Sequence, residues 1–346
     1  MLNNVQKKAL RVEPKLINPN ADRNARRLMA YLCDIYGTRV LTGQQIGVVA
    51  TPEIDVIFET TGKYPAVYGF DFMNYTPSRT ERGSVCSDTD IAIDWWNAGG
   101  IVTFCWHWNA PKDLIDIPPE RSWDRGFYTE ATTFSIGKAM NDDESEEFKL
   151  LIRDIDVIAV QLAKLQAAGV PVLWRPLHEA SGGWFWWGAE GAEPCIRLWR
   201  LLYDRLTNVH GLNNLIWVWN GQHADWYPGD EYVDIIGEDI YPPNHCYDSQ
   251  LERFNAAQAY TDANKIIALS ENGAIPDPDA MIADGAVWAW NCTWYGGFVC
   301  KEEQGRYEYS GEHTELEQFK KFYSHPLTIT RDELPDLKRE EGAGQL

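Results

Sequence analysis

The stretch VPVLWRPLHE, residues 170–179, is a short run of apolar and β-branched residues that closes on a histidine and a glutamate. Such a run is typical of a buried strand. The residues before it, 143–168, carry leucine and isoleucine at helical spacing, and Gly169 followed by Pro171 is a common way for a chain to leave a helix and enter a strand. This part of the chain therefore predicts a helix followed by a strand, the unit of parallel β/α folds.

Similar units recur along the chain. Candidate strands lie at residues 39–45, 66–72, 101–108, 170–179, 215–220, 233–241, 266–271 and 286–291. Candidate helices lie at residues 21–36, 143–168, 194–209, 251–263, 279–284 and 313–324. Residues 110–132 are expected to form a long loop, and the helix after the fifth strand is poorly marked.

Eight strands with helices between them predict a single (β/α)8 TIM barrel. We expect one catalytic domain over residues 1–346, with an N-terminal extension (about 1–20) and a short polar C-terminal tail at the surface (about 330–346). A doubly wound open sheet is the competing architecture. It is disfavoured because no GxGxxG follows the first strand and the chain has no Walker A motif.

The composition narrows the range of partners. A formal net charge of −20 repels phosphate backbones and anionic lipid, which argues against nucleic-acid and membrane-surface roles. No stretch reaches the roughly 18 apolar residues of a membrane helix. The 16 Trp, 16 Tyr and 12 Phe fit either a Trp-rich core or a groove of aromatic platforms for sugar rings. The seven cysteines include no CxxC pair, so neither a disulfide scaffold nor a zinc site is expected.

Two glutamates stand at the ends of candidate strands. Glu179 closes the fourth strand and Glu271 the seventh, and in a (β/α)8 barrel the catalytic groups sit at the C-terminal ends of strands, here on opposite sides of the mouth. One such glutamate could cap a loop or pair with an arginine such as Arg175. Two facing carboxyls are what glycoside hydrolysis requires, because one protonates the leaving oxygen while the other attacks the anomeric carbon.

These two roles need different pKa values. An apolar wall and the charge of Glu271 would raise the pKa of Glu179. Three tryptophans close in sequence are candidates for this wall, Trp184, Trp186 and Trp187. Glu271 is expected to stay ionised through a hydrogen bond from Tyr241 or Arg175.

The block RPLHE…SGGWFWWG, residues 175–188, resembles glycoside hydrolase family 26, whose best-known members are β-mannanases. Other segments resemble the same family in the same order: LTGQQ (41–45), FDFMNY (70–75), FCWHW (104–108), DIIGEDIY (234–241) and LSENG (269–273). The resemblance covers roughly residues 41–291. It implies a retaining, two-step hydrolase on a barrel, with Glu179 as acid/base and Glu271 as nucleophile.

The resemblance also implies roles for other residues. His178 precedes the acid/base where most of the related families have asparagine, which is the habit of family 26. Together with His107 and Trp184 it would line the subsite where the bond is cut, and Tyr241 would orient the nucleophile. Further supporting or sugar-contacting positions are Trp108, Arg175, Asp234, Asp239 and, as a floor beneath the sugar, Trp290 or Trp288. Ordinary core packing is the alternative for His107 and Trp288.

The expected substrate is a β-1,4-linked mannan, galactomannan or glucomannan, cut within the chain. A β-1,3-xylanase or mixed-linkage β-glucanase on the same two glutamates, or a non-catalytic carbohydrate-binding barrel, are the alternatives. Ala180 and Ser181 after the acid/base, and the charged segment 300–313, depart from the family pattern and leave the glycan open.

No metal or cofactor is expected, and we expect a monomer. The resemblance favours a secreted protein. The cytoplasm is the alternative, because residues 1–16 contain no continuous apolar run of the kind that signal peptides carry.

Overall fold

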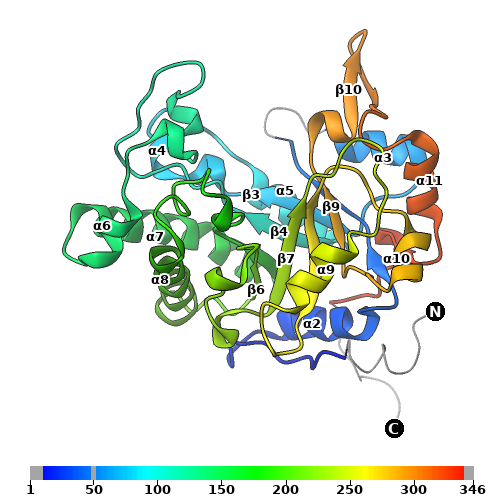
Figure 1. Cartoon of the computed structure of the whole chain (residues 1–346), viewed down its shortest axis with the longest axis horizontal. Helices are drawn as coiled ribbons and strands as arrows, with labels where there is room; N and C mark the ends of the chain where they lie inside the picture. Colours follow the sequence, from blue (N-terminus) through cyan, green and yellow to red (C-terminus); the bar gives the residue numbers. More distant parts are fainter. Residues whose placement is uncertain (1–10, 48–51, 339–346) are drawn as a thin grey trace.

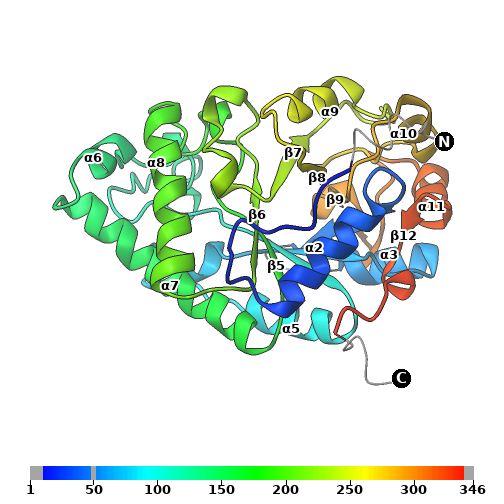
Figure 2. The ribbon, with the colours of Figure 1, turned by 90° about the horizontal axis from the view of Figure 1, so that it is seen from below.

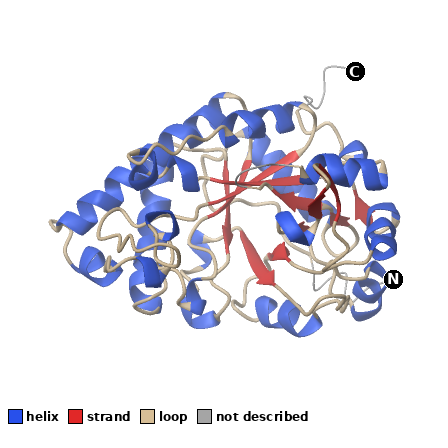
Figure 3. Cartoon of the chain, turned by 90° about the horizontal axis from the view of Figure 1, so that it is seen from above, coloured by secondary structure: helices blue, strands red, loops and turns tan. Residues whose placement is uncertain are grey.

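A closed barrel of eight parallel strands, joined in the order β2-β3-β4-β5-β6-β7-β8-β9, forms the centre of the molecule (Figure 3). The computed structural model describes residues 11–47 and 52–338. The barrel strands are β2 (Gly43–Gln45), β3 (Val67–Asp71), β4 (Ile101–Cys105), β5 (Val172–Arg175), β6 (Leu215–Trp219), β7 (Ile235–Ile240), β8 (Ile266–Asn272) and β9 (Asn291–Thr293). The predicted (β/α)8 barrel is confirmed.

Most helices form a layer outside these strands (Figure 1). The helices are α2 (Arg23–Ile35), α3 (Glu53–Thr61), α4 (Pro77–Thr80), α5 (Asp88–Asn97), α6 (Ile136–Asn141), α7 (Glu146–Ala167), α8 (Ala192–Tyr203), α9 (Leu251–Gln258), α10 (Pro278–Asp284) and α11 (Leu316–Ser324). None of those in the described ranges is long and apolar enough to cross a membrane.

Helix α2 differs from the others, because it crosses the end of the barrel where the strands begin (Figure 2). Asn24 on this helix donates to the Gly169 carbonyl, which lies just before β5. The Tyr36 hydroxyl at its end accepts from the Ile267 amide at the start of β8. The opposite end of the barrel, where the strands finish, carries the loops that follow the strands.

Helix α7 shows how the sequence forms the outer layer. The Ser145 side chain caps its first turn by accepting from the Phe148 amide at 3.1 Å. Its apolar stripe is buried against the barrel, with Leu151, Ile155, Ile158, Leu162 and Leu165 at helical spacing. It ends before Gly169, whose φ of 71° is the left-handed conformation that glycine adopts readily.

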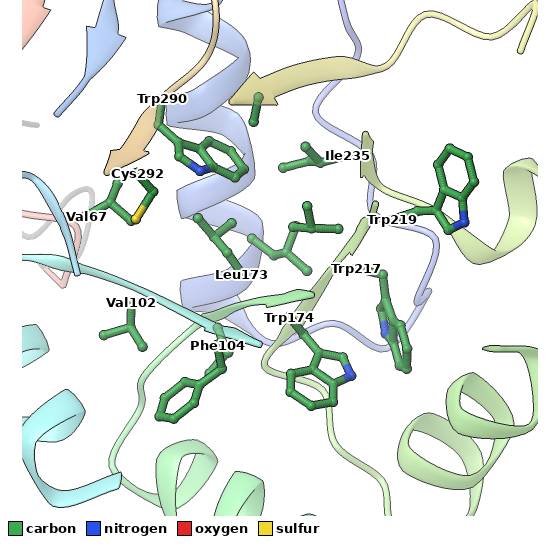
Figure 4. Close-up of a cluster of buried hydrophobic side chains, with 14 of the residues drawn as sticks. Val67, Val102, Phe104, Leu173, Trp174, Trp217, Trp219, Ile235, Trp290 and Cys292 are labelled. Carbon is green, nitrogen blue, oxygen red and sulfur yellow. The ribbon is translucent and has the colours of Figure 1, made fainter. Parts of the chain in front are cut away.

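Side chains on the strands alternate between the barrel interior and the helix layer. Leu173 and Trp290 lie inside the ring of strands, whereas Trp174 and Trp217 lie outside it (Figure 4). Trp217 packs edge-on against Trp199 of α8, with ring centroids 5.6 Å apart. Much of the unusual tryptophan content is therefore core, because eight tryptophan side chains are fully buried: Trp106, Trp108, Trp174, Trp186, Trp187, Trp217, Trp288 and Trp290.

The first predicted strand is split in the structure, and the last predicted strand is shifted along the sequence. The segment predicted at 39–45 is two strands, and β1 (Val40–Leu41) pairs with β12 (Thr328–Ile329) outside the barrel. The strand predicted at 286–291 is shifted, since β9 begins at Asn291. The backbone of residues 286–290 makes only isolated hydrogen bonds to the segments beside it, β1 and β8. This apolar run therefore enters the barrel without forming a regular ladder.

Some segments outside the barrel also differ from expectation. Helices α3 and α5 were not predicted, because polar and β-branched residues interrupt their apolar positions. The unassigned segment 300–313 contains an antiparallel hairpin of β10 (Cys300–Glu303) and β11 (Arg306–Tyr309) that projects from the body (Figure 1). The long loop at 110–132 holds only short 3-10 turns, as predicted.

The two ends of the chain pack more closely than their polar composition suggested. In the N-terminal extension, Val12 and Leu16 are buried. In the tail, Thr330 is buried and the guanidinium of Arg331 lies 4.1 Å from the ring of Tyr64. The rest of both predicted segments, residues 1–10 and 339–346, lies outside the described residues.

Candidate active site

Glu179 lies on a tight turn after β5. The strand was predicted to run to Glu179 but ends at Arg175, because Leu177 (φ 50°) and Glu179 (φ 54°) are in the left-handed region that a strand cannot contain. Such a conformation is costly for a residue with a side chain and is often found at functional sites. Asn220, which follows β6, fixes the turn: its carbonyl accepts from the Glu179 amide at 2.7 Å and its side-chain oxygen accepts at 3.2 Å.

Glu271 is held on the opposite side of the mouth, inside β8. The pairing of β8 with β7 shifts register between Glu238 and Asp239, opposite Glu271, as a β-bulge does. The two oxygens of Glu271 have different donors. Oε1 accepts from the Arg175 guanidinium, and Oε2 accepts from the Tyr241 hydroxyl at 2.6 Å. Both expected partners of Glu271 are therefore in place.

The carboxyls of the site are close together. One oxygen each of Glu179, Asp239 and Glu271 lies within 4.8 Å of the other two. Carboxyls about 5–5.5 Å apart suit a retaining glycosidase, and an inverting one needs about 6.5–9.5 Å to admit a water. The spacing of Glu179 and Glu271 thus fits direct attack on the sugar.

Arg175 supplies the positive charge for this acidic cluster. It is buried and also donates to Asp239 at 2.8 Å, so it bridges two carboxylates. Burial alone would lower the pKa of the guanidinium, but the two carboxylates outweigh that effect and raise it. A cluster of three acidic groups could hold a metal ion. Here the arginine already donates to one oxygen of Asp239 and one oxygen of Glu271.

Glu179 has a different environment from Glu271. Burial, followed by the negative charge of Glu271, raises the pKa of Glu179 to about 7. The indole Nε1 of Trp184 donates to Glu179 Oε2 at 2.9 Å, and the Trp184 side chain is 45% exposed. A carboxyl with this pKa can carry a proton near neutral pH and release it during the reaction.

The three tryptophans expected beside Glu179 differ in what their indole N–H groups bind. Trp184 donates to the carboxyl itself, whereas Trp186 and Trp187 donate to backbone carbonyls. Trp186 donates to the carbonyl of Trp108 at 2.5 Å, and Trp187 donates to the carbonyl of His178 at 2.9 Å. The two indoles therefore tie the loop after η4 (Ala180–Gly182) to the end of β4 and to the Glu179 turn.

His107 and His178 lie side by side, with their Nε2 atoms 3.1 Å apart. His107 Nδ1 lies 2.6 Å from Asp71 Oδ2. Burial alone would lower the pKa of His107, but the Asp71 carboxylate outweighs it and raises that pKa. Burial, and then the charge of His107, lowers the pKa of His178. These opposite shifts favour a protonated His107 and a neutral His178, the arrangement in which His107 donates to His178 beside Glu179.

Trp108 anchors the segment that carries His107. It is fully buried, stacks on Trp106 with ring centroids 4.0 Å apart and donates to Asp154 of α7 at 2.9 Å. With its carbonyl taken by Trp186, it fixes the segment that carries His107.

Asp234 is not part of the site. It precedes β7, at the end of the barrel opposite the mouth. Its carboxylate accepts from the amides of Ile17 and Trp217, at 2.8 Å and 2.9 Å, and so fastens the N-terminal extension to the barrel. It was assigned to the site because it lies in a family-like segment, although the predicted strand at 233–241 already placed it near the start of that strand.

Trp288 or Trp290 was expected to lie beneath the bound sugar, and this expectation needs correction. Trp288 is fully buried against Phe254 of α9 and donates to the Ser249 carbonyl. Trp290 points into the barrel interior below the mouth (Figure 4). Because inward positions alternate, Cys292 and then Trp294 follow Trp290 on the same face. Trp294 therefore lies closer to the mouth than Trp290: its ring centroid lies 5.9 Å from that of His107, and it lines a cavity of about 30 Å³ with Gln45 and Asp71.

Comparisons with known proteins agree with this geometry. The model of glycosyl hydrolase family 26 matches residues 17–333. A mannan endo-1,4-beta-mannosidase of Thermothelomyces thermophilus is 45% identical over 93% of this chain, and two from a Piromyces species are 38% and 36% identical over 94%. The chain spans only 64%, 55% and 52% of the lengths of these three relatives.

Solved structures are similar over the same range. The GH26-CBM35 β-(1,4)-mannanase of Podospora anserina superposes with a TM-score of 0.88 at 44% identity, covering 94% of this chain and 70% of that one. A β-mannanase from a symbiotic protist of the termite Reticulitermes speratus, solved with a gluco-manno-oligosaccharide, gives 0.82 at 34% identity, covering 94% and 98%. With a family match over nearly the whole chain and relatives this similar, the protein belongs to glycosyl hydrolase family 26.

Proposed function

We propose that this chain is a retaining, endo-acting β-1,4-mannanase. The observation that carries the proposal is the pair of unlike carboxyls, Glu179 and Glu271, with oxygens within 4.8 Å of each other at the mouth of the barrel. The names of its relatives support mannan as the glycan. The ligand named for the termite-symbiont enzyme, a gluco-manno-oligosaccharide, supports the same class of substrate.

In the first step, Glu179 protonates the glycosidic oxygen while a Glu271 oxygen attacks the anomeric carbon. The bond to the leaving sugar breaks, and an ester forms between Glu271 and the bound sugar. Arg175 and Tyr241 hold Glu271 for this attack, through one hydrogen bond to each oxygen. Positioning of this kind can supply several kcal/mol of the barrier reduction.

In the second step, the ester removes the negative charge of Glu271. That charge is one of the causes of the raised pKa of Glu179. Its loss makes Glu179 a stronger acid, so the carboxyl that has given up its proton stays ionised and takes a proton from the attacking water. The same residue thus acts first as acid and then as base.

The experiment is to incubate the protein with carob galactomannan, β-1,3-xylan and lichenan and to follow both viscosity and reducing ends. The proposal expects oligosaccharides from mannan, with viscosity falling early because internal bonds are cut. Release from xylan or lichenan instead would keep the two-carboxylate mechanism and overturn the substrate. Release from none would overturn the hydrolase itself, and release at the wild-type rate in Glu179→Ala and Glu271→Ala would overturn the roles of the two glutamates.

We propose further that the enzyme acts as a monomer outside the cell. Asp239, Glu271 and Tyr241 are joined by hydrogen bonds within the mouth of one barrel, so the proposed steps need no group from a second copy. A polymer such as mannan does not cross a membrane, which supports export. Light scattering of the purified protein and activity in the culture medium of the source organism test these points. A dimer, or activity confined to cells, would contradict them.

A further inference from the structure

Tyr241 holds one oxygen of Glu271, but its own ring is only partly enclosed. The hydroxyl lies 2.6 Å from Glu271 Oε2, and the residue as a whole is 43% exposed. A half-exposed side chain keeps rotamer freedom unless something packs on its flank. The precision of the hydrogen bond to Glu271 therefore depends on what touches the Tyr241 ring.

Phe298 is the aromatic side chain against that ring in the described part of the chain. It belongs to η8 (Gly296–Phe298), and its ring centroid lies 5.6 Å from that of Tyr241 at 61°, an edge-on contact. Gly273, two residues after Glu271, lies beside both rings. A Cβ on Gly273 would be 3.3 Å from Phe298 Cε1 and 3.4 Å from Tyr241 Cδ1. The glycine leaves the space in which the two rings meet.

Phe298 is itself held at the base of the β10–β11 hairpin. Its other neighbour is His313, which stacks on it with ring centroids 4.0 Å apart. The hairpin lies between these two residues in the sequence, and the Ser310 amide closes its base by donating to the Val299 carbonyl. On the other side, the buried carboxyl of Glu53 accepts from the Gly296 amide at 2.9 Å. The hairpin base thus places a fixed ring against Tyr241.

We propose that Phe298 is a positioning residue for the nucleophile, which acts by holding the Tyr241 hydroxyl on Glu271. Gly273 and His313 complete the arrangement, one by leaving space and the other by stacking. The inference rests on the proposed function, since it assigns to the hairpin base a part in the same reaction. It also gives a role to a segment that has no counterpart in the family motifs quoted from the sequence.

The test is a double-mutant cycle between Phe298→Ala and Tyr241→Phe, with kcat and KM measured on the glycan that the wild-type enzyme hydrolyses. Tyr241→Phe should lower kcat by about 100-fold and Phe298→Ala by about tenfold, because small misplacements at a reacting group are costly. The double variant should be no slower than Tyr241→Phe alone. KM should change little, and Phe298→Leu should recover most of the loss.

The matched control is Tyr307→Ala, an exposed aromatic on the same hairpin, which should leave kcat unchanged. If Phe298→Ala fails to fold in a thermal melt, Gly273→Ala replaces it. The added Cβ would lie 3.3 Å from Phe298 Cε1 and crowd the same ring contact, so this variant should lose activity only when Tyr241 is present. Losses that multiply in the double variant, or an unchanged kcat for Phe298→Ala, would overturn the inference.

A crystal structure of Phe298→Ala gives a readout that does not depend on activity. The inference expects the Tyr241 hydroxyl to lie beyond hydrogen-bond distance of Glu271, more than about 3.5 Å away. Retention of the bond would overturn it. If the wild-type protein hydrolyses no glycan, the proposed function fails, and this structure still decides whether Phe298 positions Tyr241.

Discussion

The turn after β5 and the end of β8 each present one glutamate to the same mouth, and they do so in opposite ways. Glu179 itself has a left-handed backbone conformation, and its carboxyl accepts one hydrogen bond from the exposed indole of Trp184. Glu271 lies within strand β8, where the pairing with β7 shifts register, with a cation on one oxygen and a phenol on the other. The difference shows how one chain can give two chemically identical side chains the unlike environments that an acid and a nucleophile need.

The largest effect should come from Glu271. Glu271→Ala removes the group that forms the covalent bond, and kcat should fall by on the order of 10⁵-fold on every substrate, whatever its leaving group. Initial rates on mannan and on a dinitrophenyl β-mannoside measure this. Near-normal turnover of the activated mannoside by this variant would mean that the two roles are exchanged.

A smaller and more selective loss should follow from Glu179→Ala. Removal of a general acid costs about 10²–10⁴-fold on natural glycans, whose leaving group needs a proton. On the dinitrophenyl mannoside the first step no longer needs the acid, so a glycosyl-enzyme should accumulate and appear in the intact mass of the protein. Equal losses on both substrates, with no added mass, would argue against Glu179 as the acid/base.

The Glu271 region, unlike the Glu179 turn, should contribute strongly to the unfolding free energy through Arg175. It is buried and shared by Asp239 and Glu271, so Arg175→Met leaves two buried carboxylates without their cation. Breaking a buried ion pair on one side costs about 3–5 kcal/mol of unfolding free energy. Urea unfolding at neutral pH measures it, with Arg205→Met, a half-exposed partner of Asp156, as the control that should cost much less. Equal costs would contradict the account of the cluster.

The smallest effect is a shift in pH dependence. Because Glu179 must be protonated in the first step, kcat/KM should fall as pH rises through about 7. The Trp184 N–H favours the ionised form, so Trp184→Phe should raise the pKa of Glu179 and move this fall to higher pH by up to about one unit. Trp123→Phe, in the loop of residues 110–132, is the control. A shift to lower pH would show that the indole acts differently.

The barrel and its central pair could be predicted from the sequence, because both depend on local patterns. Short apolar runs marked most strands, and a polar residue at the end of such a run marked the mouth. Glu179, Glu271 and Tyr241 all lie where that rule puts them. The rule works because the strands of a barrel finish at the same end.

The site residues that were missed depend on where a strand ends and on contacts distant in sequence, and local patterns fix neither. Asp234 is a different case: it was assigned to the site from the family resemblance, although it lies near the start of the predicted strand 233–241 and precedes β7 at the other end of the barrel. Trp294 was missed because the last strand was ended at Asn291, two inward-facing positions too early. Extending the alternation from Trp290 would have found it. Phe298 carries no sequence signal at all, since its role comes from a hairpin that brings it back to Tyr241.

The most direct test of the central claim is the configuration of the first product. Proton NMR of mannopentaose during hydrolysis by the wild-type enzyme distinguishes the newly formed α- and β-anomers before they equilibrate. The account predicts that the β-anomer appears first, because attack by Glu271 and then by water inverts the anomeric carbon twice. An α-anomer formed first would mean a single displacement by water, and Glu271 would not be the nucleophile.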